Sequence, residues 1–255
     1  MAGPSVLGIS SGAGLGVALL TMGSSFLGIQ SLLENNVSIS VVIAAIIGAF
    51  IVLGGILLLS NKIKNTLSIL IIGLMLGALT TAIVGILSYF TKAEQLQQYM
   101  FWGFGSLGHL SNEELWVLVS FIFLGIIGII PLLKPLNSLL LGENYAQTLG
   151  VNLNKLKNQT LIISGIITGI ITAFVGPIAF IGLAVPHIAR LIFKTSNHKI
   201  ILPAVLLLGA IILLICDSIA QLPLSENVLP INAITSLFGA PLVIWLLIRQ
   251  KKYHF

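Results

Sequence analysis

Long runs of apolar residues, separated by short polar stretches, follow one another along the whole chain. Most are close to the roughly 20 residues that an α-helix needs to cross the hydrocarbon core of a bilayer. Strand-like alternation of apolar and polar residues, typical of membrane β-barrels, is not a feature of these runs. Since backbone groups in lipid must be hydrogen-bonded within the segment, the runs are predicted to be spanning helices. The expected spans lie near residues 11–33, 38–59, 66–90, 115–133, 158–176, 178–194, 200–221 and 231–248.

The apolar stretch between Gln159 and Phe193 is too long for one span. Its 35 residues would form a helix of about 52 Å, whereas the hydrocarbon core is about 30 Å thick. The dipeptide Gly176-Pro177 lies near its middle and predicts a turn there. Two spans are therefore expected in this stretch, which makes eight in the chain.

The composition agrees with an all-α polytopic membrane bundle. Apolar residues make up 57% of the 255 positions, and Lys, Arg, Asp and Glu together only 7%, against about a quarter in soluble domains. So few charges exclude both a water-soluble globule and a disordered chain. The single Cys216 has no partner within the chain, which excludes a disulfide-stabilised secreted scaffold.

The charges predict the orientation in the bilayer. With eight spans and a cytoplasmic N-terminus, eleven of the twelve basic residues fall on the cytoplasmic side and only Lys92 falls outside. This is the distribution that the positive-inside rule requires, so both termini are expected in the cytoplasm. The net charge of +5 is then explained by the membrane, and no nucleic-acid partner is expected. The cytoplasmic set is Lys62, Lys64, Lys134, Lys155, Lys157, Arg190, Lys194, Lys199, Arg249, Lys251 and Lys252.

Motifs for catalysis, nucleotide binding or metal binding are not found. Gly12-x-Gly14-x-Gly16 follows no predicted strand and lacks the Lys-Ser/Thr of a phosphate-binding loop. The four histidines have no partner at helical spacing and no cluster of Cys or carboxylates beside them. The chain is therefore predicted not to be an enzyme and to hold no cofactor or metal of its own.

Asp217 is the one ionisable residue that the sequence places well inside a span, in the outer half of the seventh. A charged group there costs about 2.5–3.5 kcal/mol on insertion scales, so it needs a partner, for which Ser218 or a backbone amide is available. Two interpretations stay open: a hydrogen-bonded contact between helices, or a proton relay in a transporter driven by an ion gradient.

The longest cytoplasmic loop, residues 134–157, has its own pattern. Leu136, Leu139 and Leu140 recur at helical spacing, and so do Tyr145, Ala146 and Leu149 after an interruption at Gly142. The pattern predicts two short amphipathic helices, the second ending at Gly150. Their apolar faces suit either the lipid surface or a partner protein.

Several motifs, in order along nearly the whole chain, resemble the iron–siderophore and vitamin B12 family of ABC importer permeases. The segment from Ala2 to Ala13 is similar to the cytoplasmic loop before the family's third helix, and Trp102-Gly-x-Gly-Ser-Leu107 to its outer-face motif. Gly142-Glu-x-x-Ala-x-x-Leu-Gly150 resembles its coupling loop, and the run from Gly176 to Arg190 its most distinctive signature. Leu202-Pro203, Gly209-Ala210, Asp217, Leu229-Pro-Ile231 and Gly239-Ala-Pro241 continue the match.

The resemblance implies a permease subunit of a binding-protein-dependent importer in the bacterial inner membrane. Such permeases pair as homo- or heterodimers in the bilayer, receive an iron chelate, haem or cobalamin from a substrate-binding protein, and import it with ATP hydrolysis by partner ATPase subunits. The coupling-loop residues implied are Leu141, Gly142, Glu143, Ala146, Leu149 and Gly150. The signature turn comprises Gly176, Pro177, Gly182, Pro186, His187 and Arg190. Weaker candidates for the translocation pathway are Thr66, Ser68, Thr80, Thr81, Thr235 and Ser236.

The sequence departs from the family pattern in two places. Family members have ten helices, so two are expected to be missing at the front, through either a late start or a truncated, inactive copy. The family usually has Arg four residues after the Asp of its ninth helix, but this chain has Gln221, which puts that contact with the binding protein in doubt. An autonomous ion-coupled transporter and a non-transporting remnant are the alternatives to the importer.

His187 and Arg190 allow two interpretations. In the first, Pro186 ends regular helix geometry and Arg190 reaches the lipid headgroups. In the second, this turn braces the coupling loop and transmits motion from the ATPase.

Overall fold

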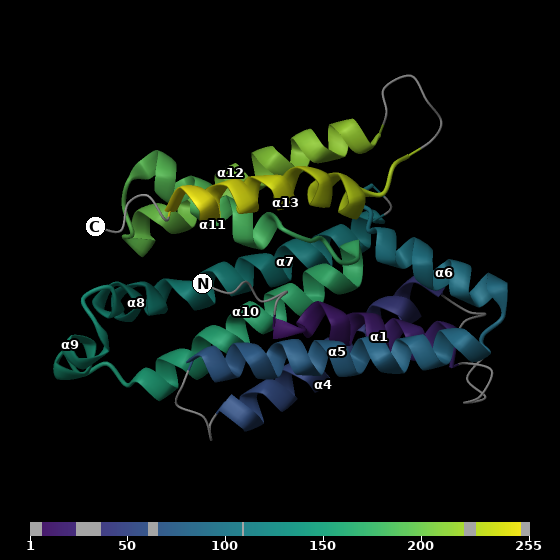
Figure 1. The fold of residues 1–255 in the computed structure, drawn as a ribbon, viewed down its shortest axis with the longest axis horizontal. Coiled ribbons are helices and arrows are strands. Elements are labelled where there is room, and N and C mark those ends of the chain that lie inside the picture. Colours follow the sequence, from purple (N-terminus) through teal and green to yellow (C-terminus); the bar gives the residue numbers. More distant parts are fainter. Residues whose placement is uncertain (1–6, 24–36, 61–65, 109, 222–227, 251–255) are drawn as a thin grey trace.

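The structure is a computed structural model that describes residues 7–23, 37–60, 66–108, 110–221 and 228–250. This part of the chain is built of helices and their connections, without strands (Figure 1). The longer helices run roughly along the long axis of the molecule. Their bounds are α1 Ile9–Thr21, α4 Val37–Ser60, α5 Thr66–Phe90, α6 Ala93–Phe104, α7 Asn112–Ile129, the 3₁₀ helix η2 Ile130–Leu132, α8 Leu133–Leu139, α9 Glu143–Thr148, α10 Leu153–Val175, α11 Ile181–Phe193, α12 His198–Ala220 and α13 Ile231–Gln250.

A helix occupies each of the eight predicted apolar segments, which confirms the helical membrane bundle. Five helical stretches, containing α4, α5, α7 to α8, α10 and α12, are long and apolar enough to cross a bilayer. The apolar helices of the other three segments, α1, α11 and α13, are shorter. Among the described residues, the first helix ends at Thr21, earlier than the predicted 33, and residues 24–33 of that segment lie outside the description. The tail from residue 251 and residues 1–6 of the front motif also lie outside it.

Side-chain caps explain why two helices begin earlier than predicted. The Ser111 hydroxyl accepts from the Glu114 backbone N–H at 3.3 Å, and the Glu114 carboxylate accepts from the Ser111 backbone N–H at 2.9 Å. This capping box satisfies two N–H groups at the start of α7. The Asn152 side chain accepts from the Lys155 N–H and likewise begins α10. Both starts consist of polar residues, which a search for apolar runs leaves out.

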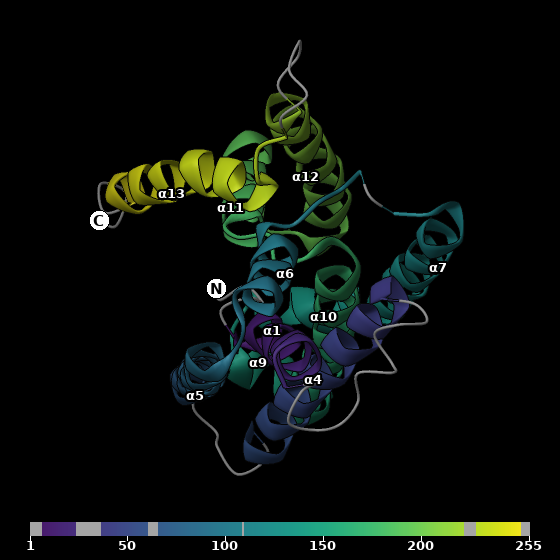
Figure 2. The same ribbon diagram turned by 90° about the vertical axis from the view of Figure 1, so that its right-hand side faces the viewer.

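The helices form two groups. The first is centred on α1, which packs against α4, α5, α6 and α10, with α7 packed on α10. The second consists of α11, α12 and α13. Figure 2 shows the second group above the first, with α5 and α13 on the same side of the molecule. Packing between the groups occurs near their two ends, between α8 and α12 and between α6 and α13.

Small residues allow the first group to pack closely. A Cβ atom on Gly12 or Gly48 would meet the backbone of the other helix of the α1–α4 pair, and one on Gly73 would lie 2.8 Å from the Leu7 Cα. Backbone contact of this kind is typical of helix pairs in membranes, where lipid removes the hydrophobic drive for association. Gly165 of α10 lies in close contact of another kind, since a Cβ atom there would lie 2.5 Å from the Leu53 side chain of α4.

The chain reverses where Gly176-Pro177 predicts a turn. α10 ends at Val175, five residues follow without helical structure, and α11 begins at Ile181. Gly176 has φ +80° and Phe180 has φ +65°, so both lie in the left-handed region. After the reversal α11 packs against α12 and α13 rather than along α10. The turn therefore passes the chain from the first helix group to the second.

Candidate functional site

The segment between α7 and α10 contains the two short helices that the sequence predicts. α8 and α9 are separated at Gly142, which has φ +108° and ψ +155°. At the end of α9 the Gly150 N–H donates to the Gln147 carbonyl at 2.9 Å, and the Val151 N–H donates to the Ala146 carbonyl at 3.0 Å. With Gly150 at φ +82° this is a Schellman motif. Residues 133–150 are called the two-helix segment below.

One face of the two-helix segment is apolar and exposed. Ala146 is buried and anchors α9 against its neighbours. The large apolar side chains of Leu141, Tyr145 and Leu149 are instead more than half exposed, and Glu143 is exposed beside them. Apolar side chains grouped in this way on a short exposed element are typical of a surface that another molecule covers.

The two ends of the bundle differ in charge. The end that carries the two-helix segment, on the left in Figure 1, has basic residues beside the helix ends. The opposite end carries acidic residues at the starts of α6 and α7 and near the end of α12, with Lys92 among them. The basic residues of the first end whose side chains are described are Lys134, Lys155, Lys157, Arg190, Lys194 and Lys199, and the acidic residues of the opposite end are Glu94, Glu113, Glu114 and Asp217.

The turn after α10 holds the end of α6 in place. A Cβ atom on Gly176 would lie 2.6 Å from the Trp102 carbonyl oxygen and 2.8 Å from the Gly105 Cα, so only glycine fits without a shift. The Ser106 N–H donates to the Val175 carbonyl at 2.9 Å. On the other side of the turn, the Ala179 N–H donates to the Asn232 side chain of α13 at 3.2 Å. The turn thus joins α6, α10 and α13 at the acidic end.

The later residues of the predicted signature lie away from this turn. Gly182 has open space where a side chain would lie. α11 continues through Pro186 to Phe193, so the prediction that Pro186 ends the regular helix is wrong. The helix tolerates this proline although its ring nitrogen cannot donate to the Gly182 carbonyl. The His187 Nδ1 donates to the Leu183 carbonyl at 2.9 Å, and Arg190 lies in the last turn of α11, at the basic end.

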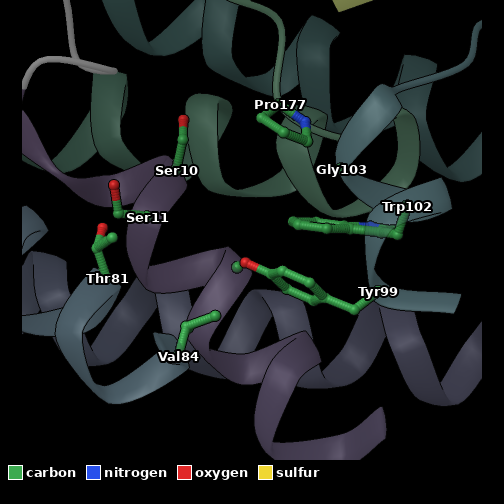
Figure 3. A pocket seen from close by; sticks show the side chains of 9 residues that line it. Ser10, Ser11, Thr81, Val84, Tyr99, Trp102, Gly103 and Pro177 are labelled. Carbon is green, nitrogen blue, oxygen red and sulfur yellow. The ribbon is translucent and has the colours of Figure 1, made fainter. Parts of the chain in front are cut away.

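A cavity of about 320 Å³ lies between α1, α5, α6 and the Gly176-Pro177 turn. Figure 3 shows the Tyr99 and Trp102 rings on one side of it and Ser10, Ser11 and Thr81 on the other. The two ring centroids are 6.3 Å apart. Burial raises the pKa of the Tyr99 phenol, so its hydroxyl stays protonated at neutral pH. The described residues around this hydroxyl-lined cavity include no charged side chain.

The candidate pathway residues do not come together at one place. Thr80 and Thr81 both donate to the Gly77 carbonyl within α5, and only Thr81 reaches the hydroxyl-lined cavity. Thr235 in α13 is fully buried and donates to the Asn232 carbonyl, with Ser236 partly buried beside it. Ser68 is partly buried near the start of α5, and the side chain of Thr66 lies outside the description.

Asp217 lies in the last turn of α12 rather than deep within a span. Its Oδ2 accepts a hydrogen bond from the Gln221 Nε2 at 2.7 Å. The suggested partner Ser218 is wrong, since its hydroxyl donates to the Leu214 carbonyl instead. Asp217 and Gln221 line a second cavity of about 390 Å³, together with the chain between α6 and α7 and the start of α13. Among the described residues, no group of three or more metal-binding side chains occurs.

Two groups of polar residues in the structure were not predicted as site residues from the sequence. Ser10, Ser11 and Tyr99 line the hydroxyl-lined cavity, and only the spacing of hydroxyl residues around a glycine-rich helix start could have indicated them. Asn137 in α8 and Asn197 before α12 are hydrogen-bonded to each other at 2.8 Å, although they are 60 residues apart. No sequence pattern relates these two asparagines.

The apolar helices, the basic and acidic ends of the bundle and the polar cavity between the helices together define a polytopic membrane permease. The chain belongs to the FecCD transport family, which it matches over residues 1–249. It is 35% identical over 253 residues to the vitamin B12 import system permease protein BtuC of Salmonella typhi and of Salmonella newport, covering 99% of this chain and 74% of each relative. A solved structure described as an inward-facing conformation of a metal-chelate type ABC transporter matches with a TM-score of 0.85 and 29% identity. That match covers 98% of this chain and 76% of the other. The resemblance found in the sequence motifs is thus confirmed, and the chain is an ABC importer permease of this family.

Proposed function

We propose that this chain imports an iron chelate, such as a ferric siderophore or haem, or alternatively a cobalamin, using ATP that a partner subunit hydrolyses. The observation that carries the proposal is the exposed apolar face of the two-helix segment at the basic end of a FecCD-family permease. Hydrolysis takes place in the partner, and the membrane chain provides the pathway and its gate.

The exposed face around α9, at the end of the two-helix segment, is the proposed docking site for the ATPase. Leu141, Tyr145 and Leu149 offer an apolar face, and Glu143 adds a charge beside it. Helices of six and seven residues are not stable on their own, so contacts outside each helix must hold its orientation. Gly142 and Gly150 set that orientation through their positive φ angles, and the buried Ala146 anchors α9.

A second permease subunit, either identical or related, is proposed to complete the pathway. α5 and α13 lie on the same side of the molecule (Figure 2), and both carry large exposed apolar side chains along their length. The hydroxyl-lined cavity opens beside α5, and its uncharged polar lining suits passage of a bulky chelate without tight binding. The relatives named for vitamin B12 import and metal-chelate transport support this class of cargo.

The basic end is proposed to face the cytoplasm of a bacterium, within the inner membrane. The six basic residues of that end whose side chains are described follow the positive-inside rule, whereas the described residues of the opposite end include four acids and Lys92. The substrate-binding protein would then deliver its cargo to the acidic end, where the second cavity lies.

The first test is co-purification in mild detergent of the tagged chain with the ATPase subunit encoded beside its gene. We expect about one ATPase per permease, and we expect Tyr145→Ser to weaken the association. Tyr89→Ser is the control, because Tyr89 is also an exposed tyrosine, at 83% against 51% for Tyr145, and lies at the other end of the molecule. If the wild-type chain binds no ATPase, the proposed function is contradicted; if both tyrosine variants bind equally well, only the docking site is contradicted.

A further inference from the structure

The two-helix segment is attached to the second helix group by one set of polar contacts. The Asn137 Nδ2 donates to the Asn197 Oδ1 at 2.8 Å. The Asn137 Oδ1 accepts from the His198 backbone N–H at 2.8 Å and pairs with the His198 Nδ1 at 2.8 Å. Asn137, Asn197 and His198 are called the polar clasp below.

The chemistry of the polar clasp determines the direction of every bond in it. The Asn197 Oδ1 also accepts from the Lys199 backbone N–H at 3.0 Å, so this atom is an oxygen and Asn137 must present its NH₂ to it. The His198 backbone N–H can only donate, so the other end of the Asn137 amide must be its oxygen. The His198 Nδ1 therefore carries a proton and donates as well. An amide with both a donor and an acceptor is required at position 137.

The polar clasp lies where it can transmit a force from α8 to α12. α8 is continuous with α7 of the first helix group through the 3₁₀ helix η2, and it packs on α12 of the second group. Asn197 caps α12, so Asn137 holds the start of that helix. On its other side α8 leads to Gly142, where no atom lies within 4 Å of the position of a Cβ atom. Without the clasp, a force on α9 would move α8 without moving α12.

We propose that Asn137 is a positioning residue that couples the two-helix segment to the α11–α13 group, so that a displacement caused by the ATPase reaches those helices. The inference rests on the proposed function. The clasp stays closed during transport, and α8 moves with the start of α12 as one body. At the acidic end the groups meet where α6 packs on α13 and where the Ala179 N–H donates to the Asn232 side chain, and there these contacts serve as the pivot.

The test uses the whole complex of permease, ATPase and binding protein in phospholipid vesicles, with radiolabelled vitamin B12 and a radiolabelled ferric hydroxamate chelate as probes. For Asn137→Ala we expect normal assembly and basal ATP hydrolysis, but a fall of about fivefold or more in cargo imported per ATP. Ser138→Ala is the matched control, because the Ser138 hydroxyl donates only within α8, to the Lys134 carbonyl. Loss of assembly in Asn137→Ala would make Asn137 a folding contact and overturn the coupling role.

A rescue experiment separates coupling from mere stability. Asn137→Cys and Asn197→Cys are combined in a Cys216→Ser background, which leaves no other thiol in this chain. We expect this variant to be uncoupled, and a short bifunctional thiol reagent that bridges the two positions to restore import per ATP. A bridge that blocks import, or an Asn137→Ala variant as well coupled as Ser138→Ala, overturns the proposal. If vesicles that contain the wild-type complex import neither probe when ATP is added, the proposed function is contradicted instead.

Discussion

Gly16 of α1 lies so close to Ala44 of α4 that a Cβ atom on Gly16 would overlap the Ala44 carbonyl group. The same helix pair has Gly12 facing Gly48 one turn away. α1 is thereby held at the centre of the first helix group, and its start lines the hydroxyl-lined cavity. The contact between these two backbones thus sets the position of Ser10 and Ser11.

The first prediction concerns this contact. Gly16→Ala forces the two helices apart, and overpacking of this kind costs about 1–3 kcal/mol. We expect the free energy of unfolding in mixed micelles to fall by that amount. Gly54→Ala is the control, because no atom lies within 4 Å of its missing side chain and alanine favours a helix by up to about 1 kcal/mol. Equal stability of the two variants would contradict the packing argument.

The second prediction concerns the bend in the two-helix segment. Gly142 has φ +108° and ψ +155°, a region that side chains other than glycine enter only with strain of about 1–3 kcal/mol. Gly142→Val should therefore change the angle between α8 and α9 and weaken binding of the ATPase by about 5- to 150-fold. Membrane insertion should be unchanged. Binding is measured by titration of the ATPase onto the detergent-solubilised chain.

Ser138→Ala provides the reference for Gly142→Val, since its hydroxyl bonds only within α8. If Gly142→Val binds the ATPase as tightly as this reference, the bend is not part of the docking surface.

The helical fold could be predicted from the sequence because each span is a local pattern. A helix lies in each of the eight predicted apolar segments, and Gly176-Pro177 marked the reversal after α10, but the more polar helix α6 was not predicted. The packing partners could not be predicted this way. α11 leaves α10 to pack on α12 and α13, and that choice depends on which surfaces fit together rather than on any local pattern.

The residues of the candidate sites were likewise predictable only where the signal was local in the sequence. Gly142 and Gly150 were predictable because a glycine after an amphipathic stretch indicates a left-handed turn. Asn137 was not, because its partners Asn197 and His198 follow 60 residues later. Asp217 was expected within the membrane with Ser218 or a backbone amide as its partner, whereas the side chain of Gln221, the residue that follows α12, donates to its carboxylate.

The third prediction concerns the end of α4 near the basic end. The Lys157 ammonium of α10 donates to the Ser60 carbonyl at 2.7 Å, and Ser60 is buried. A cation at a helix C-terminus and a charge-assisted hydrogen bond each contribute about 1–2 kcal/mol in a partly buried setting. Lys157→Met should lower the free energy of unfolding by about that amount, as measured by thermal and denaturant unfolding in micelles. Lys155→Met removes the same charge from an exposed position and should leave stability within about 0.5 kcal/mol. A similar loss in both variants would show that only the net charge matters.

The last prediction decides what Asp217 does. Asparagine at this position keeps an oxygen that can accept from the Gln221 Nε2, but it cannot release or take up a proton. A negative charge in the last turn of a helix is unfavourable, so Asp217→Asn should leave stability unchanged or raise it by up to about 1 kcal/mol. ATP-driven import in vesicles should persist in this variant without a proton gradient. Import that is lost in Asp217→Asn but kept in Asp217→Glu would require a carboxyl group that exchanges protons. That outcome would favour the ion-coupled alternative, because hydrogen bonding to Gln221 alone does not distinguish the acid from the amide.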